Sequence, residues 1–345
     1  METYRAAIIG LGRMGSTIDE EVKDYPAIPL PYSIAGACRQ SSRLELVAGA
    51  DLLPEKRSAF QERWGVTALY EDYRQMIRQE APDLVAICTR AENHAELALG
   101  VAEEGVGMVF LEKAMACSMR EADAVLVAYQ ERGIAFNTGV LRRFDGRYHR
   151  AREWIQSGQL GTARTAVHLA PASLMHGHIH SVDTLMYLLG DPKAVRVRGE
   201  LQGDLARRGN RLDQDPRATY QVQFEGGVEA WSLPAGYWDF EVFGDQGTIC
   251  GMNNGIDWAA RRPVAQGRHT IYRSEPFPSP VPQSPTLYLL EDLVRAKEEG
   301  RPSLGNVEVT HRATEVCLAV AQSHLSGGGW IELPLEDRDL YVWHV

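Results

Sequence analysis

Short apolar runs alternate with amphipathic stretches along the first 140 residues. The apolar runs cover residues 6–9, 44–48, 84–88, 107–111 and 134–136. Runs this short and this uniformly apolar are typical of strands that are buried on both faces of a parallel sheet. Between them, residues 95–104 and 119–132 have the spacing of amphipathic helices. This repetition of strand, helix and strand predicts a doubly wound α/β domain with right-handed crossovers.

A different pattern begins after residue 143. Apolar and polar residues alternate with a period of two in 219–224, 228–233 and 239–243, and residues 163–169 and 194–200 are further strand candidates. Glu225-Gly226-Gly227 and Asp245-Gln246-Gly247 supply tight turns. The pattern predicts an antiparallel sheet with one face available for helices or a partner subunit.

The sheet strands also bear on assembly. Tyr220, Val222 and Phe224 belong to a strand candidate with more apolar residues than one layer of helices covers, so we expect a homo-oligomer.

Two helical patterns, residues 288–299 and 307–325, follow a proline-rich segment that is predicted to be an extended connector. The change of pattern near residue 141 predicts two domains, residues 1–141 and residues 142–345.

The charge balance and the cysteines narrow the partners and the compartment. The 345 residues include 36 Lys and Arg against 46 Asp and Glu, a formal net charge of −10. A surface of this sign repels phosphate backbones and anionic lipid headgroups, which argues against nucleic-acid and membrane partners. The five cysteines are scattered without a C-x-x-C pair, and the first residues do not have the pattern of a signal peptide. We therefore expect reduced thiols in a cytoplasmic protein.

A glycine motif follows the first predicted strand. It reads G-x-G-x-x-G and consists of Gly10, Leu11, Gly12, Arg13, Met14 and Gly15. At this place in an α/β chain, the glycines permit a tight turn, the close approach of the backbone to a pyrophosphate, and the packing of a helix on the strand. The motif predicts that residues 1–141 form a Rossmann dinucleotide-binding domain, with the anion at a helix N-terminus.

Asp51 ends the second predicted strand. A carboxylate there accepts hydrogen bonds from both ribose hydroxyls of NAD and repels the 2′-phosphate of NADP. The alternative is a solvated carboxylate at a strand end. The gap between Gly15 and Asp51 is longer than the usual spacing of about 20 residues, so residues 19–42 contain an insertion. This insertion either clamps the adenosine and slows cofactor release or is a surface excursion.

Glu112 and Lys113 follow the strand candidate 107–111, at the edge of the sheet where doubly wound folds bind ligands. Here nearly the whole chain resembles the Gfo/Idh/MocA family, which includes glucose-fructose oxidoreductase and inositol dehydrogenase. The resemblance rests on Gly10–Gly15, Cys88-Thr89 with Asn93-His94, Glu112-Lys113-Ala114, Arg142-Arg143-Phe144, His180-Ser181-Val182-Asp183 before Leu188-Leu189-Gly190, and Phe240-Glu241-Val242-Phe243-Gly244 with Gly247.

The resemblance implies an N-terminal Rossmann domain and a C-terminal α+β domain with a large, mostly antiparallel open sheet. It also implies assembly into a homo-oligomer, a dimer or a tetramer, through that sheet. Members of the family mostly oxidise or reduce a sugar or polyol carbon with NAD(P).

The resemblance further implies that Lys113 and His180 are the catalytic pair. It extends the cofactor site beyond the glycine motif and Asp51 to Thr89, Arg90, His94, Glu112 and Lys113. Arg90, like Arg142 and Arg143, is a candidate for contacts with substrate or cofactor, or else for an ordinary salt bridge between the domains.

Helical geometry bears on the assignment of His180, because a buried apolar stripe recurs at helical spacing in this segment. If the helix reaches back to His176, then His176, His180, Asp183 and Tyr187 lie within about 60° of one another beside the stripe. If the segment is a strand instead, His176, His178 and His180 share one face and form a candidate metal site. We expect a helix, no metal, and a structural role for His178.

One position departs from the family pattern. Most members carry an aspartate four residues before the histidine, where this chain has His176. An aspartate would orient His180 and favour its charged form, whereas a second imidazole supplies no negative charge. Asp183, one helical turn beyond His180, is the candidate substitute. The catalytic candidates are therefore Lys113, His180, His176 and Asp183.

Three functional hypotheses follow. In the first, the protein is an NAD-dependent sugar or polyol dehydrogenase in which His180 takes the proton of a substrate hydroxyl and Lys113 stabilises the developing alkoxide. In the second, it is an NAD-dependent glycosidase or lyase that oxidises a ring carbon transiently, with His176 as an extra base. In the third, it is a non-catalytic NAD-binding protein.

Overall fold

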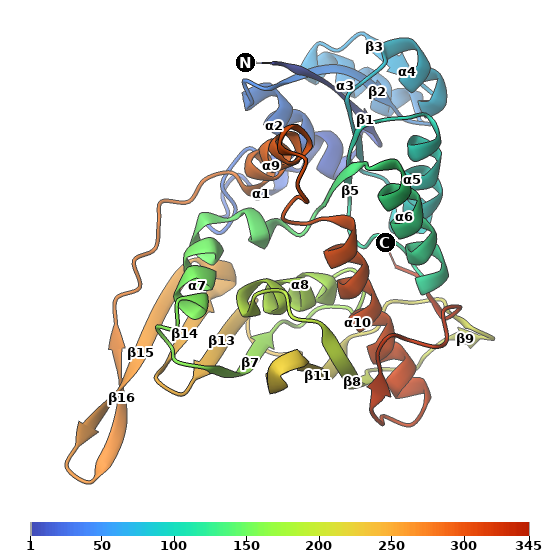
Figure 1. Cartoon of the computed structure of the whole chain (residues 1–345). Helices are drawn as coiled ribbons and strands as arrows, with labels where there is room; N and C mark the ends of the chain where they lie inside the picture. The colour runs from blue at the N-terminus through green and yellow to red at the C-terminus, as the bar shows by residue number, and fades with distance from the viewer. Residues whose placement is uncertain (1, 345) are drawn as a thin grey trace. The chain divides into compact units, whose positions relative to one another are not determined.

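Parallel strands form the sheet of the first compact unit, in the order β3-β2-β1-β4-β5-β6. Figure 1 labels β1, β2, β3 and β5 of this sheet. The computed structural model describes residues 2–344, of which residues 2–145 and Gln283–His311 belong to this unit. The strands are β1 (Tyr4–Ile9), β2 (Leu44–Ala50), β3 (Ala68–Tyr70), β4 (Leu84–Ile87), β5 (Met108–Leu111) and β6 (Ala135–Thr138). The strand order reverses between β1 and β4, and this is the place where such sheets bind ligands. The predicted doubly wound parallel sheet is confirmed.

Helices connect these strands. They are η1 (Arg13–Thr17), α1 (Asp19–Val22), α2 (Ile34–Gln40), α3 (Pro54–Trp64), α4 (Tyr73–Glu80), η2 (Ala91–Asn93), α5 (His94–Glu103), α6 (Met119–Arg132) and η3 (Leu141–Phe144). The helix predicted at residues 119–132 is confirmed at both ends. The sequence pattern does not predict α3, whose one fully buried residue is Phe60. A helix with so little buried surface has no apolar stripe that reveals its periodicity.

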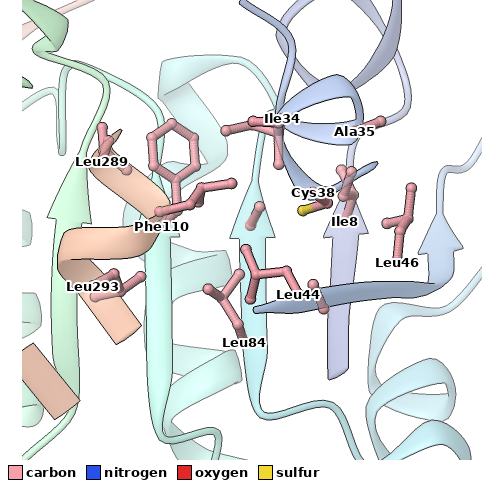
Figure 2. Packing of buried hydrophobic residues seen from close by; sticks show 14 of the residues in the cluster. Ile8, Ile34, Ala35, Cys38, Leu44, Leu46, Leu84, Phe110, Leu289 and Leu293 are labelled. Carbon is pink, nitrogen blue, oxygen red and sulfur yellow. The ribbon is translucent and has the colours of Figure 1, made fainter. Parts of the chain in front are cut away.

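Helix α9 (Pro285–Glu299) packs on this first sheet although it comes late in the sequence. Leu289 and Leu293 of α9 join a core with Ile34 and Cys38 of α2 and with Phe110 of β5 (Figure 2). Replacing one such buried leucine by alanine typically costs about 2–5 kcal/mol, so this core holds α9 firmly. The compact units are therefore divided differently from the predicted domains, because residues 283–311 fall within the predicted second domain. The assignment of cofactor binding to residues 1–141 and of substrate binding and assembly to residues 142–345 stays a prediction.

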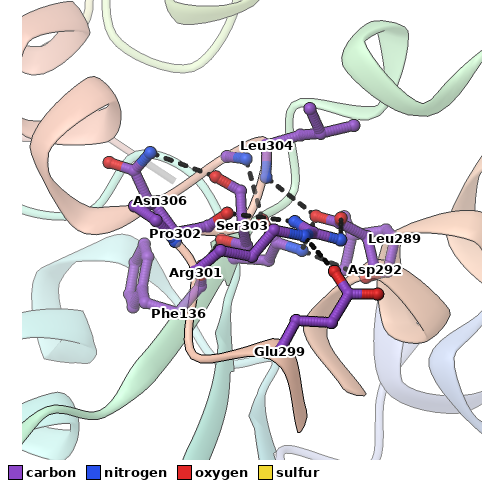
Figure 3. A network of polar contacts seen from close by, with 11 residues as sticks. Phe136, Leu289, Asp292, Glu299, Arg301, Pro302, Ser303, Leu304 and Asn306 are labelled. Atoms are coloured by element: carbon purple, nitrogen blue, oxygen red, sulfur yellow. Dashed lines mark hydrogen bonds and ion pairs between the residues drawn. The ribbon is translucent and has the colours of Figure 1, made fainter. Parts of the chain in front are cut away.

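A buried polar network ties the end of α9 to the edge strand β6 (Figure 3). The Asp292 carboxylate accepts hydrogen bonds from the backbone N–H of Leu304 (2.8 Å) and from Arg301 Nη2 (3.0 Å). Asn137 of β6 donates to the Leu289 carbonyl (3.0 Å) and accepts from the Gly305 N–H (2.9 Å). These contacts hold the segment after α9 against β6, the edge strand of this sheet.

The second compact unit, Gly146–Pro282 with Arg312–His344, contains a nine-stranded sheet within the described residues. Its order is β16-β15-β14-β13-β7-β12-β11-β8-β17. The strands are β7 (Ala163–Leu169), β8 (Ala194–Leu201), β11 (Ala218–Phe224), β12 (Glu229–Leu233), β13 (Asp239–Gly244), β14 (Gly247–Met252), β15 (Asp257–Gln266), β16 (His269–Glu275) and β17 (Ile331–Glu332). Neighbouring strands run antiparallel except β7 and β12, which are parallel. The large, mostly antiparallel sheet is confirmed.

Further elements complete this unit: α7 (Gly146–Gln156), α8 (His178–Leu189), most of α10 (Val307–Leu325), the small strands β9 (Arg207–Arg208), β10 (Arg211–Leu212) and β18 (Tyr341–Val342), and the short turns η4 (Glu225–Gly227) and η5 (Asn253–Gly255). The predicted extended connector is confirmed, because residues 276–284 have no regular secondary structure. Within residues 2–344, no helix has both the length and the apolar composition that crossing a membrane requires.

The side chains of Tyr220, Val222 and Phe224 are buried inside the second unit. They lie on the sheet face that the helices cover: the ring of His178 of α8 meets the Tyr220 ring edge-on, with the ring centroids 5.2 Å apart. The argument that these side chains need a partner subunit is therefore wrong, because helices of the same chain already cover them.

Candidate active site

Each glycine of the Gly10–Gly15 motif has its own reason to be glycine. Gly10 has a positive φ of 90°, and a Cβ there would lie 2.7 Å from the Cys88 carbonyl oxygen. A Cβ at Gly15 would overlap the Gly10 carbonyl oxygen. At Gly12, by contrast, a Cβ would have no neighbouring atom within 4 Å. The backbone is therefore open at Gly12, which fits the close approach of a pyrophosphate to this loop.

Asp51 directly follows β2, as predicted from the sequence. Its Oδ2 accepts a hydrogen bond from the backbone N–H of Leu11 in the glycine loop (2.9 Å), and its Oδ1 accepts one from the N–H of Leu53 (3.0 Å). A carboxylate offers about four acceptor positions, so two remain for ribose hydroxyls. Leu52 and Leu53 are 75% and 48% exposed. They form an exposed apolar surface next to Asp51 in the chain.

The non-glycine side chains in and next to the Gly10–Gly15 motif make different contacts. Arg13 pairs with Glu21 of α1, with 2.7 Å between Nη2 and Oε2, so its charge is already balanced. Met14 packs against the core of the first unit. The side chain of Ser16, in the same turn, accepts a hydrogen bond from Trp64 Nε1 of α3 (2.9 Å). This last contact fixes the turn that follows the motif.

The insertion in the first crossover is anchored at both ends. Asp19 Oδ1 accepts hydrogen bonds from the N–H groups of Tyr32 (2.6 Å) and Ser33 (2.9 Å), and Ser33 caps the start of α2. The hydroxyl of Thr286 of α9 donates to the Tyr32 carbonyl (2.8 Å). Burial, followed by the nearby Glu112 charge, raises the pKa of Tyr32 to about 12. Whether this segment slows cofactor release stays a hypothesis.

His94 connects the two loops that follow β4 and β5. Its ring is buried, with Nδ1 2.7 Å from the Ala114 carbonyl oxygen and Nε2 3.2 Å from the Thr89 carbonyl oxygen. Arg90, next to Thr89, is exposed. A buried ring with both nitrogens at backbone carbonyls is suited to fixing the loops on either side rather than to contacting a ligand. The assignment of His94 to the cofactor site stays a prediction.

Glu112 and Lys113 lie at the carboxyl end of β5, where the sequence placed them. The backbone N–H of Lys113 donates to Glu112 Oε2 (3.1 Å). Burial raises the pKa of the Glu112 carboxyl, and the charge of Lys113 opposes this shift. A Cβ at Gly139 would overlap Glu112 Oε1, so that glycine makes room for the carboxylate. Lys113 itself is partly buried, and a lysine held there is suited to donating a hydrogen bond to a ligand oxygen.

The two arginines after β6 differ in burial. Arg143 is fully buried and its Nη1 lies 3.5 Å from the Leu304 carbonyl oxygen, whereas Arg142 is partly exposed. The burial of Arg143 fits the structural alternative, and a contact of either arginine with substrate or cofactor stays a prediction.

In the second unit, α8 begins at His178 and carries His180, Asp183 and Tyr187. His176 lies in the preceding turn and is exposed, so the condition that the helix reaches back to His176 is not met. The strand alternative for residues 176–180, and with it the candidate three-histidine metal face, is wrong, because the residues from 178 onward are helical. Among residues 2–344, no group of three or more His, Cys, Asp or Glu side chains is placed to hold a metal ion.

The turn before α8 is held by a residue that the sequence analysis missed. Asp215 accepts hydrogen bonds from the backbone N–H groups of Met175 (2.7 Å) and His176 (2.8 Å). Nothing in the local sequence around Asp215 distinguishes it from a surface carboxylate.

The structural role expected for His178 is supported by its surroundings. The ring is fully buried, and Nδ1 lies 3.2 Å from Ser181 Oγ and 3.3 Å from Ser232 Oγ. Burial lowers the pKa of His178 to about 4. The ring is therefore neutral at ordinary pH and serves as a packed residue of the core.

His180 is partly exposed, in contrast to His178 and to the fully buried Asp183. Its ring meets the Trp238 indole edge-on, with 6.0 Å between the ring centroids. The same indole meets the buried His168 of β7 at the same centroid distance. The sequence analysis missed Trp238 and His168, because neither belongs to a motif and neither stands out from the strand patterns around it.

Family models match both parts of the chain. A model of an oxidoreductase family with an NAD-binding Rossmann fold matches residues 4–140, and a model of the C-terminal alpha/beta domain of that family matches residues 167–333. The scyllo-inositol 2-dehydrogenase (NAD(+)) of Bacillus subtilis is 29% identical over 71% of this chain and 72% of its own length. The myo-inositol 2-dehydrogenase of Thermotoga maritima is 25% identical over 54% of this chain, which spans about half (55%) of that relative.

Solved structures support the fold. An inositol dehydrogenase homologue from Azotobacter vinelandii, in complex with NADH and myo-inositol, superposes with a TM-score of 0.76 at 18% identity and covers 96% of this chain and 98% of its own. The two family models together match most of the described residues, the first over the parallel sheet and the second over most of the nine-stranded sheet. The chain therefore belongs to the Gfo/Idh/MocA family of oxidoreductases, whose N-terminal domain is an NAD-binding Rossmann fold.

Proposed function

We propose that this protein oxidises or reduces a CH–OH carbon of a sugar, glycoside or polyol with NAD as the hydride carrier. The observation that carries the proposal is the pairing of the open backbone at Gly12 with the Asp51 carboxylate, which keeps two acceptor positions for ribose. The substrate class is supported by relatives named as scyllo-inositol and myo-inositol dehydrogenases.

The proposed chemistry assigns one role to each catalytic candidate. Bound NAD supplies the acceptor for the substrate hydride. His180 takes the proton of the substrate hydroxyl, and Lys113 donates a hydrogen bond to the oxygen as negative charge develops on it. Asp183, three residues after His180 on α8, stabilises the imidazolium that forms. His176 is exposed before the helix and is the candidate for an extra base in the redox-neutral glycosidase alternative.

The cofactor assignment predicts a preference for NAD(H) over NADP(H). The Asp51 carboxylate would face the 2′-phosphate of NADP, and these two negative charges repel each other. We expect NAD(H) to bind more tightly than NADP(H) in fluorescence titrations. In Asp51→Ala and Asp51→Ser, we expect the difference between the two affinities to become smaller. Glu62→Ala is the matched control, because it removes an exposed carboxylate of α3 in the same unit and leaves Asp51 in place. Equal or tighter binding of NADP(H) to the unmodified protein would refute the assignment.

A substrate screen tests the proposed function directly. Purified protein is mixed with NAD and single sugars, polyols or glycosides, NADH formation is followed by absorbance, and products are identified by NMR. Formation of NADH with an oxidised product supports a dehydrogenase. Turnover of a glycoside without added NAD and without net NADH points to the redox-neutral alternative. Binding of NAD without turnover of any compound favours the non-catalytic alternative.

We also propose that the protein is a homo-oligomer that assembles through the outer face of the nine-stranded sheet. Leu233 and Met252 are exposed on that face, and Arg198 lies over the rings of Trp231 and Trp330. Tryptophan and arginine are the residue types most often found at the energetic centre of protein interfaces. Light scattering of a dilute sample is expected to give a multiple of the 38.3 kDa chain mass. A strictly monomeric mass would count against assembly, and Trp231→Glu should shift the distribution towards the monomer.

We place the protein in the cytoplasm, with a small-molecule substrate and without nucleic-acid or membrane partners. Two observations support this proposal. All five cysteines are free thiols, as is usual for proteins in a reducing compartment. The net charge of −10 disfavours binding to phosphate-rich polymers and surfaces.

A further inference from the structure

Trp238 has a backbone conformation that bulky residues rarely adopt. It lies between β12 and β13 with a positive φ of 58°. Asn253 and Asn254, between β14 and β15, also have positive φ values, of 51° and 55°. Asparagine tolerates this region, but a large aromatic residue there is a genuine outlier. Such conformations persist only where the surrounding structure enforces them, and they cluster at functional sites.

Hydrogen bonds lock the two connecting segments together. The Asp239 carboxylate accepts from the N–H groups of Tyr237 (3.1 Å) and Asn253 (2.7 Å). The N–H of Asn254 donates to the Tyr237 carbonyl (3.0 Å). A Cβ at Gly236 would lie 2.7 Å from Asp239 Oδ2, so the turn is also closely packed. The strained conformation of Trp238 is thus imposed by contacts on both sides of it in the chain.

The indole is held between two imidazoles. The Trp238 ring meets His180 of α8 edge-on with an interplanar angle of 82°, and it meets His168 of β7 with an angle of 78°. Both pairs have ring centroids 6.0 Å apart, within the range of attractive edge-to-face contacts. His168 is fully buried and belongs to the central part of the sheet. The indole therefore contacts both the partly exposed His180 ring and a buried side chain of the central strand β7.

We propose that Trp238 is a positioning residue that holds the His180 imidazole in the orientation needed for proton transfer. The proposal rests on the proposed function of His180, which moves a substrate proton. Proton transfer requires the acceptor nitrogen to stay within hydrogen-bond reach of the substrate hydroxyl. A ring on a helix surface with no lateral support samples several rotamers. The indole restricts these rotamers from one side, and the strained turn keeps the indole in place.

Replacing the indole tests the proposal. Trp238→Leu keeps an apolar side chain but removes both ring contacts, whereas Trp238→Phe keeps an aromatic ring. We expect the Leu variant to lose about ten- to a hundredfold in kcat with less than a threefold change in KM, because misplacing a catalytic group costs rate rather than uniform binding. We expect the Phe variant to recover most of kcat. Trp154→Leu is the matched control, because Trp154 makes an edge-to-face contact with Phe277 and none with His180.

NMR supplies a readout that does not depend on activity. The ring-proton resonance of His180 is assigned by its loss in His180→Asn, and the ring current of a neighbouring indole shifts it. We expect this resonance to move in Trp238→Leu and to stay in place in Trp154→Leu. If Trp238→Leu does not fold, Trp238→Phe carries the same test, because a phenyl ring shifts the resonance by a different amount.

The outcomes separate this proposal from the proposed function. A shifted His180 resonance with reduced kcat in Trp238→Leu supports the positioning role of Trp238. A shifted resonance in a protein that turns over no sugar supports the contact between Trp238 and His180 but contradicts the proposed function. An unmoved resonance overturns the positioning role. A rise in KM with unchanged kcat also overturns it, because Trp238 would then contact the substrate instead of positioning His180.

Discussion

His180→Ala is expected to lower kcat by about a hundred- to ten-thousandfold while the affinity for NAD stays within a few fold of the unmodified protein. The reason is that the imidazole is the proposed acceptor of the hydroxyl proton, and removing a general base typically costs this much. NAD binding is expected to survive, because Asp51 and the glycine loop belong to the first compact unit and His180 to the second. Steady-state kinetics across a range of pH, together with NAD titration, measure both effects.

His178→Gln is the matched control for this variant. His178 lies two residues before His180 on the same helix, but its ring is buried and forms hydrogen bonds with the hydroxyls of Ser181 and Ser232. We expect this control to lower the melting temperature and to leave kcat within a few fold. Near-normal turnover of a folded, NAD-binding His180→Ala protein would show that another group accepts the proton. His176 and Asp183 would then be the next pair to replace.

The first sheet could be predicted from the sequence because its central strands are buried on both faces. Leu84–Ile87 and Met108–Leu111 have every side chain buried, and continuous apolar runs of this length are typical of strands covered by helices on both sides. The strand β3 escaped prediction because its three residues are only partly buried. The strands β15 and β16 escaped for a related reason: most of their residues are partly or fully exposed, so no apolar face alternates with a polar one.

The position of α9 could not be predicted from order along the chain. Its leucines indicate a buried helix, but nothing in a single sequence says which sheet they cover. The structure assigns them to the first sheet, where Leu289 and Leu293 meet Phe110 (Figure 2). Long-range packing of this kind depends on the shapes of both surfaces, and the alternation of hydrophobic residues contains no information about the partner.

In the candidate site, too, residues with a local sequence signal could be predicted and residues that depend on long-range contacts could not. Glycine spacing and strand ends placed Gly12, Asp51 and Lys113 correctly in the fold, because local sequence determines where a strand stops and a loop begins. Contacts made by residues far apart in the sequence were missed. Asp215 holds the turn before α8, and Trp238 meets His180, yet neither has a local pattern that distinguishes it from a surface or strand residue.

Lys113→Ala is expected to lower kcat by about a hundredfold or more, with NAD affinity little changed. Lys113 follows β5 at the carboxyl edge of the sheet and is the proposed donor to the oxygen on which charge develops. A donor of this kind acts more strongly in the transition state than in the ground state, so its loss reduces kcat more than it raises KM. Lys113→Arg keeps the charge but not the geometry and is expected to recover only part of the rate. Lys297→Ala is the matched control, because Lys297 is an exposed lysine of α9 in the same unit.

The double variant Lys113→Ala/His180→Ala tests whether the two residues serve one step. Groups that act together on the same oxygen are strongly non-additive, because once one is lost the other has less charge to stabilise or less proton transfer to assist. We therefore expect the double variant to be scarcely slower than the poorer single variant. If the two losses multiply instead, Lys113 and His180 act in separate steps, and the proposal that they form a catalytic pair fails even if each is needed for turnover.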